Sequence, residues 1–266
     1  MEILPAVPAK AVVPAAGVGR RLLPVSRAVP KEMFPIGRYP AIEWVVAEAV
    51  ASGCTEVAIV ISPQKQMIRD YLTTACPDLP GSCRLTFIVQ PEPRGLGHAL
   101  WLAREFCDGL PFAVLLPDDL VDGPELPLLQ MAAAFGAHGG AVMAMAREPA
   151  NRASLYGRLQ LKRVSGRLHA IEAILARATP ATTATLFLGV GRCLFTAEVL
   201  DHAGRLLDQP PAEELDDAMI FQRMLAHGGP VHGLHLKGRR YDIATPDGYV
   251  AAWRRFGREK PTWKSH

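Results

Sequence analysis

Short apolar runs alternate with helix-like segments through the first half of this chain. The apolar runs are expected to be strands, and they are 11–14, 56–61, 85–89 and 112–116. The segments between them are expected to be helices, and they are 41–51, 63–72 and 97–106. Strands that are apolar throughout, with helices between them, are typical of a parallel sheet covered on both faces. The first half therefore predicts an α/β fold: a Rossmann-like, mostly parallel sheet with helices on both faces.

The second half is less regular but continues to mix strands and helices. Strands are expected at 141–146, 156–163, 186–194 and 232–236, and helices at 201–207, 213–226 and 246–256. The Ala/Thr-rich stretch 170–184 is expected to be a mobile loop. A chain of 266 residues with this pattern is expected to form a single domain over 1–266.

Charge and cysteine content exclude several classes of protein. The chain has 29 Lys and Arg against 26 Asp and Glu, and an excess of +3 is too small to indicate a nucleic-acid or membrane surface. No apolar run is long enough to span a membrane. The 5 cysteines form no Cys-x-x-Cys pair, so neither a zinc site nor a disulfide framework is expected. These features predict a cytoplasmic protein with reduced thiols.

A glycine loop with arginines follows the first apolar run directly. Its sequence over 15–24 is AAGVGRRLLP, and a lysine, Lys31, stands between two prolines further on. Glycines expose backbone N–H groups to an anion, and the arginines and the lysine add positive charge. The Gly-x-Gly pattern by itself fits an ordinary strand-to-helix turn equally well. It lacks the third glycine of the dinucleotide fingerprint and the Gly-Lys-Ser/Thr of a Walker loop.

Polar residues also follow the third and fourth apolar runs. Gln90 begins the stretch QPEPRGLGHA, and its amide offers both a donor and an acceptor for a pyrimidine edge. The alternative is a polar loop that leads into a helix. Asp118 and Asp119 end the fourth run, where a carboxylate suits a hard cation that holds phosphate oxygens. Paired aspartates at a strand end also serve as simple turn formers.

The stretch 10–40, KAVVPAAGVGRRLLPVSRAVPKEMFPIGRYP, resembles the signature of bacterial sugar-nucleotide pyrophosphorylases. It is most similar to the UTP–glucose-1-phosphate uridylyltransferases, and Gln90 to Ala99, Pro117 to Asp119 and Tyr241 to Ile243 match further motifs of that family. The resemblance covers residues 10–257. It implies a glycosyltransferase-A-like nucleotidyltransferase fold, with a nucleotide-binding half over 10–125 and a smaller sugar-phosphate-binding half over 140–257.

The resemblance also implies roles for individual residues. The residues expected to be catalytic are Arg21, Lys31 and Asp118. Those expected to bind the nucleotide are Ala16, Gly17, Gly19, Gln90 and Gly95, with Gln90 on the uracil. Asp118 and Asp242 are the expected ligands of Mg²⁺. Two positions depart from the family: Arg20 replaces a threonine, and Ala244 replaces the glycine that follows the second aspartate motif.

The sugar-binding motifs match the family less well. Gly157 fits its Tyr-Gly-Val motif, and an ungapped alignment places Arg177 at the lysine that holds the sugar phosphate. The same alignment puts Ala176 where the family has a glutamate that accepts hydrogen bonds from the sugar. Loss of such an acceptor costs on the order of 1–3 kcal/mol when its partner is left unpaired.

The expected reaction is transfer of a uridylyl group from UTP to a sugar 1-phosphate, with glucose 1-phosphate as the expected acceptor. One alternative is a weakly active or inactive paralogue that binds nucleotide or regulates a partner. Another is the same reaction with a different sugar or nucleotide. By analogy with the family, the protein is expected to form a homo-oligomer, a dimer or tetramer, and to bind neither nucleic acid nor membrane.

Overall fold

A nine-stranded sheet runs through the protein, in the order β5-β4-β1-β6-β11-β8-β12-β10-β9. The computed structural model describes residues 6–76, 83–150, 158–175, 185–208 and 215–261. The strands of this sheet are β1 (Lys10–Pro14), β4 (Glu56–Ile61), β5 (Arg84–Val89), β6 (Phe112–Leu115), β8 (Ala141–Pro149), β9 (Arg158–Ser165), β10 (Leu168–Leu175), β11 (Thr185–Phe195) and β12 (Val231–His235).

The first-half strands β5, β4, β1 and β6 lie side by side and run parallel. In the register, Val12 of β1 pairs with Ala58 of β4 on one side and with Val114 of β6 on the other. The four apolar runs are thus confirmed as strands of a parallel sheet. Because β1 lies inside the sheet, the glycine loop that follows it emerges at the carboxyl edge, where α/β proteins bind ligands.

The second-half strands make the sheet mixed, although most of its strands run in one direction. β11 is antiparallel to both β6 and β8, and β12 is parallel to β8. β10 is antiparallel to β12 and β9. The expectation of a loop over 170–184 is wrong for 170–175, which belong to β10, because Ile171 and Ile174 are buried in the core. Residues 176–184 lie outside the described part of the chain.

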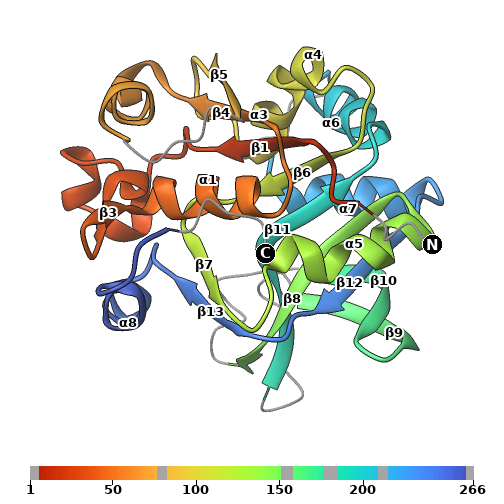
Figure 1. Ribbon diagram of the computed structural model, residues 1–266. Coiled ribbons are helices and arrows are strands. Elements are labelled where there is room, and N and C mark those ends of the chain that lie inside the picture. Colours follow the sequence, from red (N-terminus) through yellow and green to blue (C-terminus); the bar gives the residue numbers. More distant parts are fainter. Residues whose placement is uncertain (1–5, 77–82, 151–157, 176–184, 209–214, 262–266) are drawn as a thin grey trace.

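Helices cover both faces of the sheet (Figure 1). One core packs against α1 (Ala41–Ala51), α2 (Gln66–Asp70), α5 (Pro127–His138) and α8 (Pro246–Phe256). The other packs against α3 (Leu96–Leu102), α4 (Arg104–Cys107), α6 (Glu198–Leu207) and α7 (Asp217–Ala226). Successive β1 residues alternate between the two cores, with Ala11 and Val13 in the first and Val12 in the second. This alternation is why an apolar run without polar positions forms a strand here.

Capping residues explain where several helices begin and end. Asp216 Oδ1 accepts a hydrogen bond of 3.1 Å from Met219 N, so α7 begins at Asp217 and not at residue 213. α8 has the expected bounds, and Thr245 Oγ1 caps it by accepting from Gly248 N at 3.2 Å. The segment 97–106, expected as one helix, is divided at Ala103 into α3 and α4.

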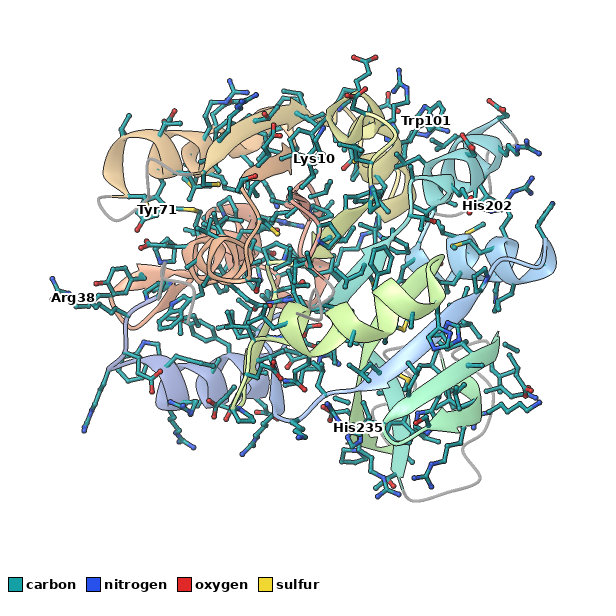
Figure 2. All side chains as sticks on the ribbon, turned by 45° about the vertical axis from the view of Figure 1, so that its right-hand side comes forward. Lys10, Arg38, Tyr71, Trp101, His202 and His235 are labelled. Atoms are coloured by element: carbon teal, nitrogen blue, oxygen red, sulfur yellow. The ribbon has the colours of Figure 1, made fainter. Side chains whose placement is uncertain are left out.

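Two helices of the second face approach each other closely. A Cβ at Gly204 of α6 would lie 2.7 Å from Cζ3 of Trp101 on α3, so only glycine fits at this contact. Trp101 and the α6 residue His202 lie near each other at the upper right of Figure 2. The contact ties the nucleotide half of the sequence to the sugar half.

Short elements complete the carboxyl edge of the sheet. β7 (Asp119–Asp122) and β13 (Arg239–Asp242) form a two-stranded antiparallel ribbon, as do β2 (Pro35–Ile36) and β3 (Tyr39–Pro40). The helical turns are η1 (Arg20–Leu22), η2 (Val25–Arg27), η3 (Lys31–Met33), η4 (Pro63–Lys65) and the π-helical η5 (Tyr71–Ala75). None of the helices in the described ranges is long and apolar enough to cross a membrane.

Candidate active site

The loop that follows β1 begins with two buried alanines and then becomes exposed. Ala15 and Ala16 are buried, whereas Gly17 is exposed and has no atom within 4 Å of the place of a Cβ. Gly19 has a φ of +70°, and Ser26 Oγ donates a hydrogen bond of 2.9 Å to its carbonyl oxygen. Because glycine adopts a positive φ without steric cost, Gly19 allows the chain to turn into η1.

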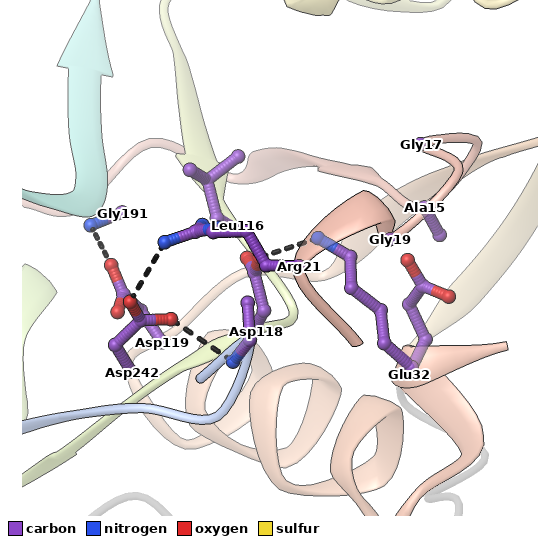
Figure 3. A network of polar contacts seen from close by, with 12 residues as sticks. Ala15, Gly17, Gly19, Arg21, Glu32, Leu116, Asp118, Asp119, Gly191 and Asp242 are labelled. Atoms are coloured by element: carbon purple, nitrogen blue, oxygen red, sulfur yellow. Dashed lines mark hydrogen bonds and ion pairs between the residues drawn. The ribbon is translucent and has the colours of Figure 1, made fainter. Parts of the chain in front are cut away.

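Arg21 of η1 contacts Asp242, which ends β13 more than two hundred residues later in the chain (Figure 3). Its Nη1 donates to Asp242 Oδ2 at 3.1 Å, and the Arg21 side chain is 41% exposed whereas that of Asp242 is 2% exposed. A phosphate accepts the same charge-assisted hydrogen bonds from a guanidinium as a carboxylate does. The solvent-accessible Arg21 can therefore exchange this carboxylate for an incoming anion.

Lys31 of η3 contacts Asp118, which follows β6. Lys31 Nζ donates a hydrogen bond to Asp118 Oδ2, and both side chains are largely buried. Burial alone would lower the pKa of Lys31, but the carboxylates of Asp118 and Glu32 outweigh it and the pKa is raised. Burial opposes the negative form of Asp118 too, yet Lys31 and Arg21 hold its pKa below the ordinary value. Both groups of the pair are therefore charged near neutral pH.

The ribbon of β7 and β13 brings the two predicted metal ligands together. Asp242 pairs in register with Asp119, and Ile243 N donates a hydrogen bond of 2.9 Å to Asp118 O. Asp242 Oδ1 accepts a further one of 3.0 Å from Ala244 N. In the described ranges Asp108 is the one non-glycine residue with a positive φ, so the φ of Ala244 is not positive. Alanine therefore fits at position 244, where the family has glycine, without backbone strain.

Both carboxylate oxygens of Asp119 are used in hydrogen bonds within the protein. Its Oδ2 accepts from Gly191 N at 2.8 Å (Figure 3). Its Oδ1 accepts from Arg240 Nε at 2.7 Å. Burial raises the pKa of Asp119, and Arg240 opposes that shift. Of the two neighbouring aspartates, Asp118 is therefore the one available to a ligand of the site.

A fully buried arginine, Arg192 of β11, holds the turn that carries Asp118. Its Nε and Nη2 donate to the two carboxylate oxygens of Glu48 on α1, at 2.8 and 2.7 Å. Its Nη1 donates to Leu116 O at 3.1 Å, and its Nη2 to Asp119 O at 2.8 Å. Arg192 is 0% exposed. The position of Asp118 thus depends on a salt bridge whose partners are far apart in the sequence.

Gln90 lies at the end of β5 and its amide is held from two sides. Its Nε2 donates to Gly95 O at 3.0 Å and contacts His98 Nδ1 at 3.2 Å. Burial lowers the pKa of His98, with a further contribution from Arg94, which favours the neutral ring that accepts this hydrogen bond. Gly95 has a φ of +93°, and a Cβ there would lie 2.3 Å from Leu215 O. His98 has no role predicted from the sequence, and the structure shows that it orients Gln90.

Two adjoining cavities open at this edge and share Leu96, Leu116 and Asp118. The first has a volume of about 190 Å³ and includes five predicted site residues besides Asp118, namely Ala16, Gly17, Lys31, Gln90 and Gly95. The second has a volume of about 180 Å³ and is lined by the charged side chains of Arg21, Asp119, Arg240 and Asp242 and by apolar residues that include Leu100, Cys193 and Phe221. Asp118 stands where the two cavities meet.

Two predicted residues, Gly157 and Arg177, lie outside the described residues, as does Ala176. Four other residues of the site have no role predicted from the sequence: Glu48, Lys65, Arg192 and Arg240. The signal for Glu48 was a charged residue inside a helix that is otherwise mostly apolar and buried, whereas Lys65 lies among exposed residues and gave no such signal. Such a residue is almost always paired when it is buried, but its partner is not apparent from the sequence.

Comparison with known proteins agrees with this geometry. Residues 10–259 match the nucleotidyl transferase family. A UTP–glucose-1-phosphate uridylyltransferase of Komagataeibacter xylinus is 31% identical over 265 residues, covering 92% of this chain and 91% of that protein. A UTP–glucose-1-phosphate uridylyltransferase of Bacillus subtilis (strain 168) is 29% identical, and the alignment covers 91% of this chain and 88% of that protein. A UDP-glucose pyrophosphorylase structure from Acinetobacter baumannii has a TM-score of 0.83 at 27% identity, covering 95% and 94%.

A mostly parallel sheet with a glycine loop, cations and carboxylates at its carboxyl edge is the arrangement of a nucleotide-binding α/β enzyme. The chain belongs to the nucleotidyl transferase family. Enzymes of this family generally use a divalent metal. Within the described ranges, no three His, Cys, Asp or Glu side chains are grouped so as to hold a metal on their own.

Proposed function

We propose that the protein transfers a uridylyl group from UTP to a sugar 1-phosphate, with glucose 1-phosphate as the expected acceptor. The products are a UDP-sugar and pyrophosphate. The observation that carries the proposal is the meeting of two cavities at Asp118, beside Lys31 and Arg21. One cavity is lined by four of the five residues predicted to bind nucleotide, namely Ala16, Gly17, Gln90 and Gly95, and its neighbour offers space for a second substrate. The names of the relatives support UTP and glucose 1-phosphate as the pair.

In this reaction a phosphate oxygen of the sugar 1-phosphate attacks the α-phosphorus of UTP. The new P–O bond forms as the bond from the α-phosphorus to the bridging oxygen breaks, and pyrophosphate leaves with the electron pair. No covalent intermediate with the protein is required, so the protein contributes position and charge. The ion pairs with Asp242 and Asp118 hold the side chains of Arg21 and Lys31 in place before the phosphates bind.

The roles that we assign are those implied by the resemblance to the family, and Lys31 and Arg21 lie on either side of the junction at Asp118, Lys31 in the first cavity and Arg21 in the second. We assign the triphosphate to Arg21 and to the backbone of Ala16, Gly17 and Gly19, since Arg21 is accessible and Gly17 has free space beside it. Lys31 holds the attacking phosphate as a point charge. We assign the uracil to Gln90 and Gly95, because His98 and the Gly95 carbonyl orient the Gln90 amide in the cavity wall.

Asp118 and Asp242 would hold a magnesium ion. Mg²⁺ is usually bound by one or two carboxylates together with substrate phosphates and water, and this site offers two buried carboxylates beside a cavity. Bound there, it would neutralise charge on the phosphates. In the described chain Lys31 and Arg21 neutralise the same two carboxylates. We therefore infer that each cation moves from its carboxylate to a phosphate when the nucleotide and metal bind.

The function is tested by pyrophosphate release from the purified protein with Mg²⁺. UTP, dTTP, CTP, ATP and GTP are each combined with a panel of sugar 1-phosphates. Release with UTP and one sugar is expected and would name the acceptor. Release with another nucleotide only would replace UTP in the proposal. Silence across the panel, with UTP still bound, would favour the alternative of a paralogue that binds nucleotide without catalysis, which the change at Ala176 supports.

Arg177 provides a separate test of the sugar side. Replacement by alanine removes the cation that we assign to the sugar phosphate, so Arg177→Ala is expected to raise the sugar-phosphate KM about tenfold or more. The UTP KM is expected to change little. Steady-state kinetics with each substrate varied in turn measures both values. An equal rise in the two would reject this placement, and Arg163→Ala, an exposed residue of β9, serves as the control.

Three further expectations belong to the proposal. The single nine-stranded sheet that carries both halves supports one domain over 1–266. A homo-oligomer, dimer or tetramer, stays a prediction that light scattering would test. A cytoplasmic location, without nucleic-acid or membrane partners, also stays a prediction from the sequence.

A further inference from the structure

A loop that binds an anion through its N–H groups has carbonyl groups that need partners of their own. Two carbonyls of the glycine loop, those of Ala15 and Gly17, accept hydrogen bonds from one ammonium group. The donor is Lys65 Nζ, at 2.8 Å from Ala15 O and 2.6 Å from Gly17 O. Lys65 belongs to η4, after β4, and is therefore far from the loop in sequence.

The third hydrogen bond of Lys65 is to a carboxylate. Lys65 Nζ donates to Glu32 Oε2 at 2.8 Å, which uses the last of the three donors of an ammonium group. Glu32 is 0% exposed, and the Lys65 side chain is 11% exposed. A buried lysine that spends all three donors on protein atoms has none left for a substrate, so Lys65 acts only through the groups that it holds.

Glu32 immediately follows Lys31, the residue assigned to the attacking phosphate. Its second oxygen, Oε1, is buried and has no hydrogen-bond partner among the described residues. Burial lowers the pKa of Lys65 and raises that of Glu32, and each partner opposes the shift of the other. Lys65 thus joins the glycine loop to the segment of Lys31 through one buried ion pair. Figure 3 shows Ala15, Gly17 and Glu32 around one side of the Asp118 site.

We propose that Lys65 is a positioning residue of the nucleotide site. It holds the carbonyls of Ala15 and Gly17 on its ammonium group, and so fixes the loop in the shape that receives the triphosphate. Through its ion pair with Glu32, it also fixes the position of the loop relative to Lys31. The inference rests on the proposed function and is tested by nucleotide binding, without turnover.

The test compares UTP affinity and stability in Lys65→Met, which keeps the length of the side chain and removes its donors. Calorimetric titration with UTP and Mg²⁺ gives the Kd, and thermal denaturation gives the Tm. The Kd is expected to rise about tenfold or more, which corresponds to the loss of one charge-assisted hydrogen bond. The Tm is expected to fall as well, because Glu32 is left buried without its partner.

The double variant Lys65→Met/Glu32→Gln separates positioning from stability. It removes the unpaired charge, so its Tm is expected to return toward that of the natural protein. Its Kd for UTP is expected to stay weak, because the loop carbonyls are still not held. If Lys65→Met does not fold, Lys65→Arg replaces it in the comparison, since a planar guanidinium cannot converge on three acceptors as an ammonium does.

Lys10 offers a matched control at the opposite end of β1. Its Nζ also binds backbone carbonyls, Phe106 O at 2.6 Å and Cys107 O at 3.4 Å, away from the glycine loop. Lys10→Met is expected to leave the Kd for UTP within twofold of the natural protein. The proposal is overturned if Lys65→Met binds UTP normally, or if the double variant regains both Tm and affinity. Failure of the natural protein to bind UTP would reject the proposed function instead.

Discussion

Replacing Asp118 by asparagine is expected to leave the protein folded and to lower turnover by about two to three orders of magnitude. Asp118 stands where the two cavities meet, and its carboxylate pairs with Lys31. The neutral amide would offer one fewer negative charge to a metal and would lose the ion pair that places Lys31. Initial rates of pyrophosphate release at saturating substrates measure the effect, and circular dichroism checks the fold.

Asp122→Asn is the control for this change. Asp122 is on β7, three residues after the ribbon begins, and pairs with Arg255 of α8 through two hydrogen bonds of 2.6 Å. It lines neither of the two cavities described above. The turnover of the Asp122→Asn variant is expected to match that of the natural protein. Near-normal turnover in Asp118→Asn would remove Asp118 from both the metal site and catalysis.

Replacing Glu48 by alanine is expected to lower the free energy of unfolding by about 3–5 kcal/mol, because it leaves a buried guanidinium unpaired. Arg192 is 0% exposed and binds both carboxylate oxygens of Glu48. Solvent cannot replace that carboxylate without opening the core between α1 and β11. Urea denaturation followed by fluorescence measures the change, and a loss below about 1 kcal/mol would contradict it.

An exposed salt bridge gives the comparison. Glu56 and Arg84 approach to 3.5 Å with side chains that are 29% and 77% exposed, so Glu56→Ala is expected to cost less than about 1 kcal/mol.

Loss of the Glu48–Arg192 salt bridge in Glu48→Ala is also expected to reduce turnover at temperatures where the protein remains folded. Arg192 holds the carbonyls of Leu116 and Asp119, and the turn between them carries Asp118.

Periodicity in the sequence predicted several elements of the fold, although the expected helices 63–72 and 97–106 are each divided in the structure. The apolar runs at 11–14, 56–61, 85–89 and 112–116 are strands, and the helices 41–51 and 246–256 have the bounds expected for them. These elements are long or bounded by strong signals such as Gly53 after α1 and Thr245 before α8. A signal that lies within a few residues of the element it bounds is readable without the rest of the chain.

Other elements gave no comparable signal. The strands β7 and β13 of the ribbon have only four residues each. They pair with each other although they are far apart in the sequence. Most of the strand β10 lies in the Ala/Thr-rich stretch that was expected to be a loop. It forms a strand because Ile171 and Ile174 are buried in the core that includes α7. Strand formation there depends on burial, and burial depends on the fold.

The candidate site divides in the same way. Local patterns around the glycine loop, Gln90 and Asp118 indicated residue types that suit nucleotide chemistry, and the resemblance to the family added Asp242 and the individual roles. The tertiary structure decided which of them meet: Arg21 pairs with Asp242, Lys31 with Asp118, and Lys65 with Glu32 and the loop carbonyls. It also made Arg192 and Glu48 a buried support for Asp118. Each pair joins distant segments, because a charge removed from water needs a partner wherever packing places it, and local spacing does not specify that place.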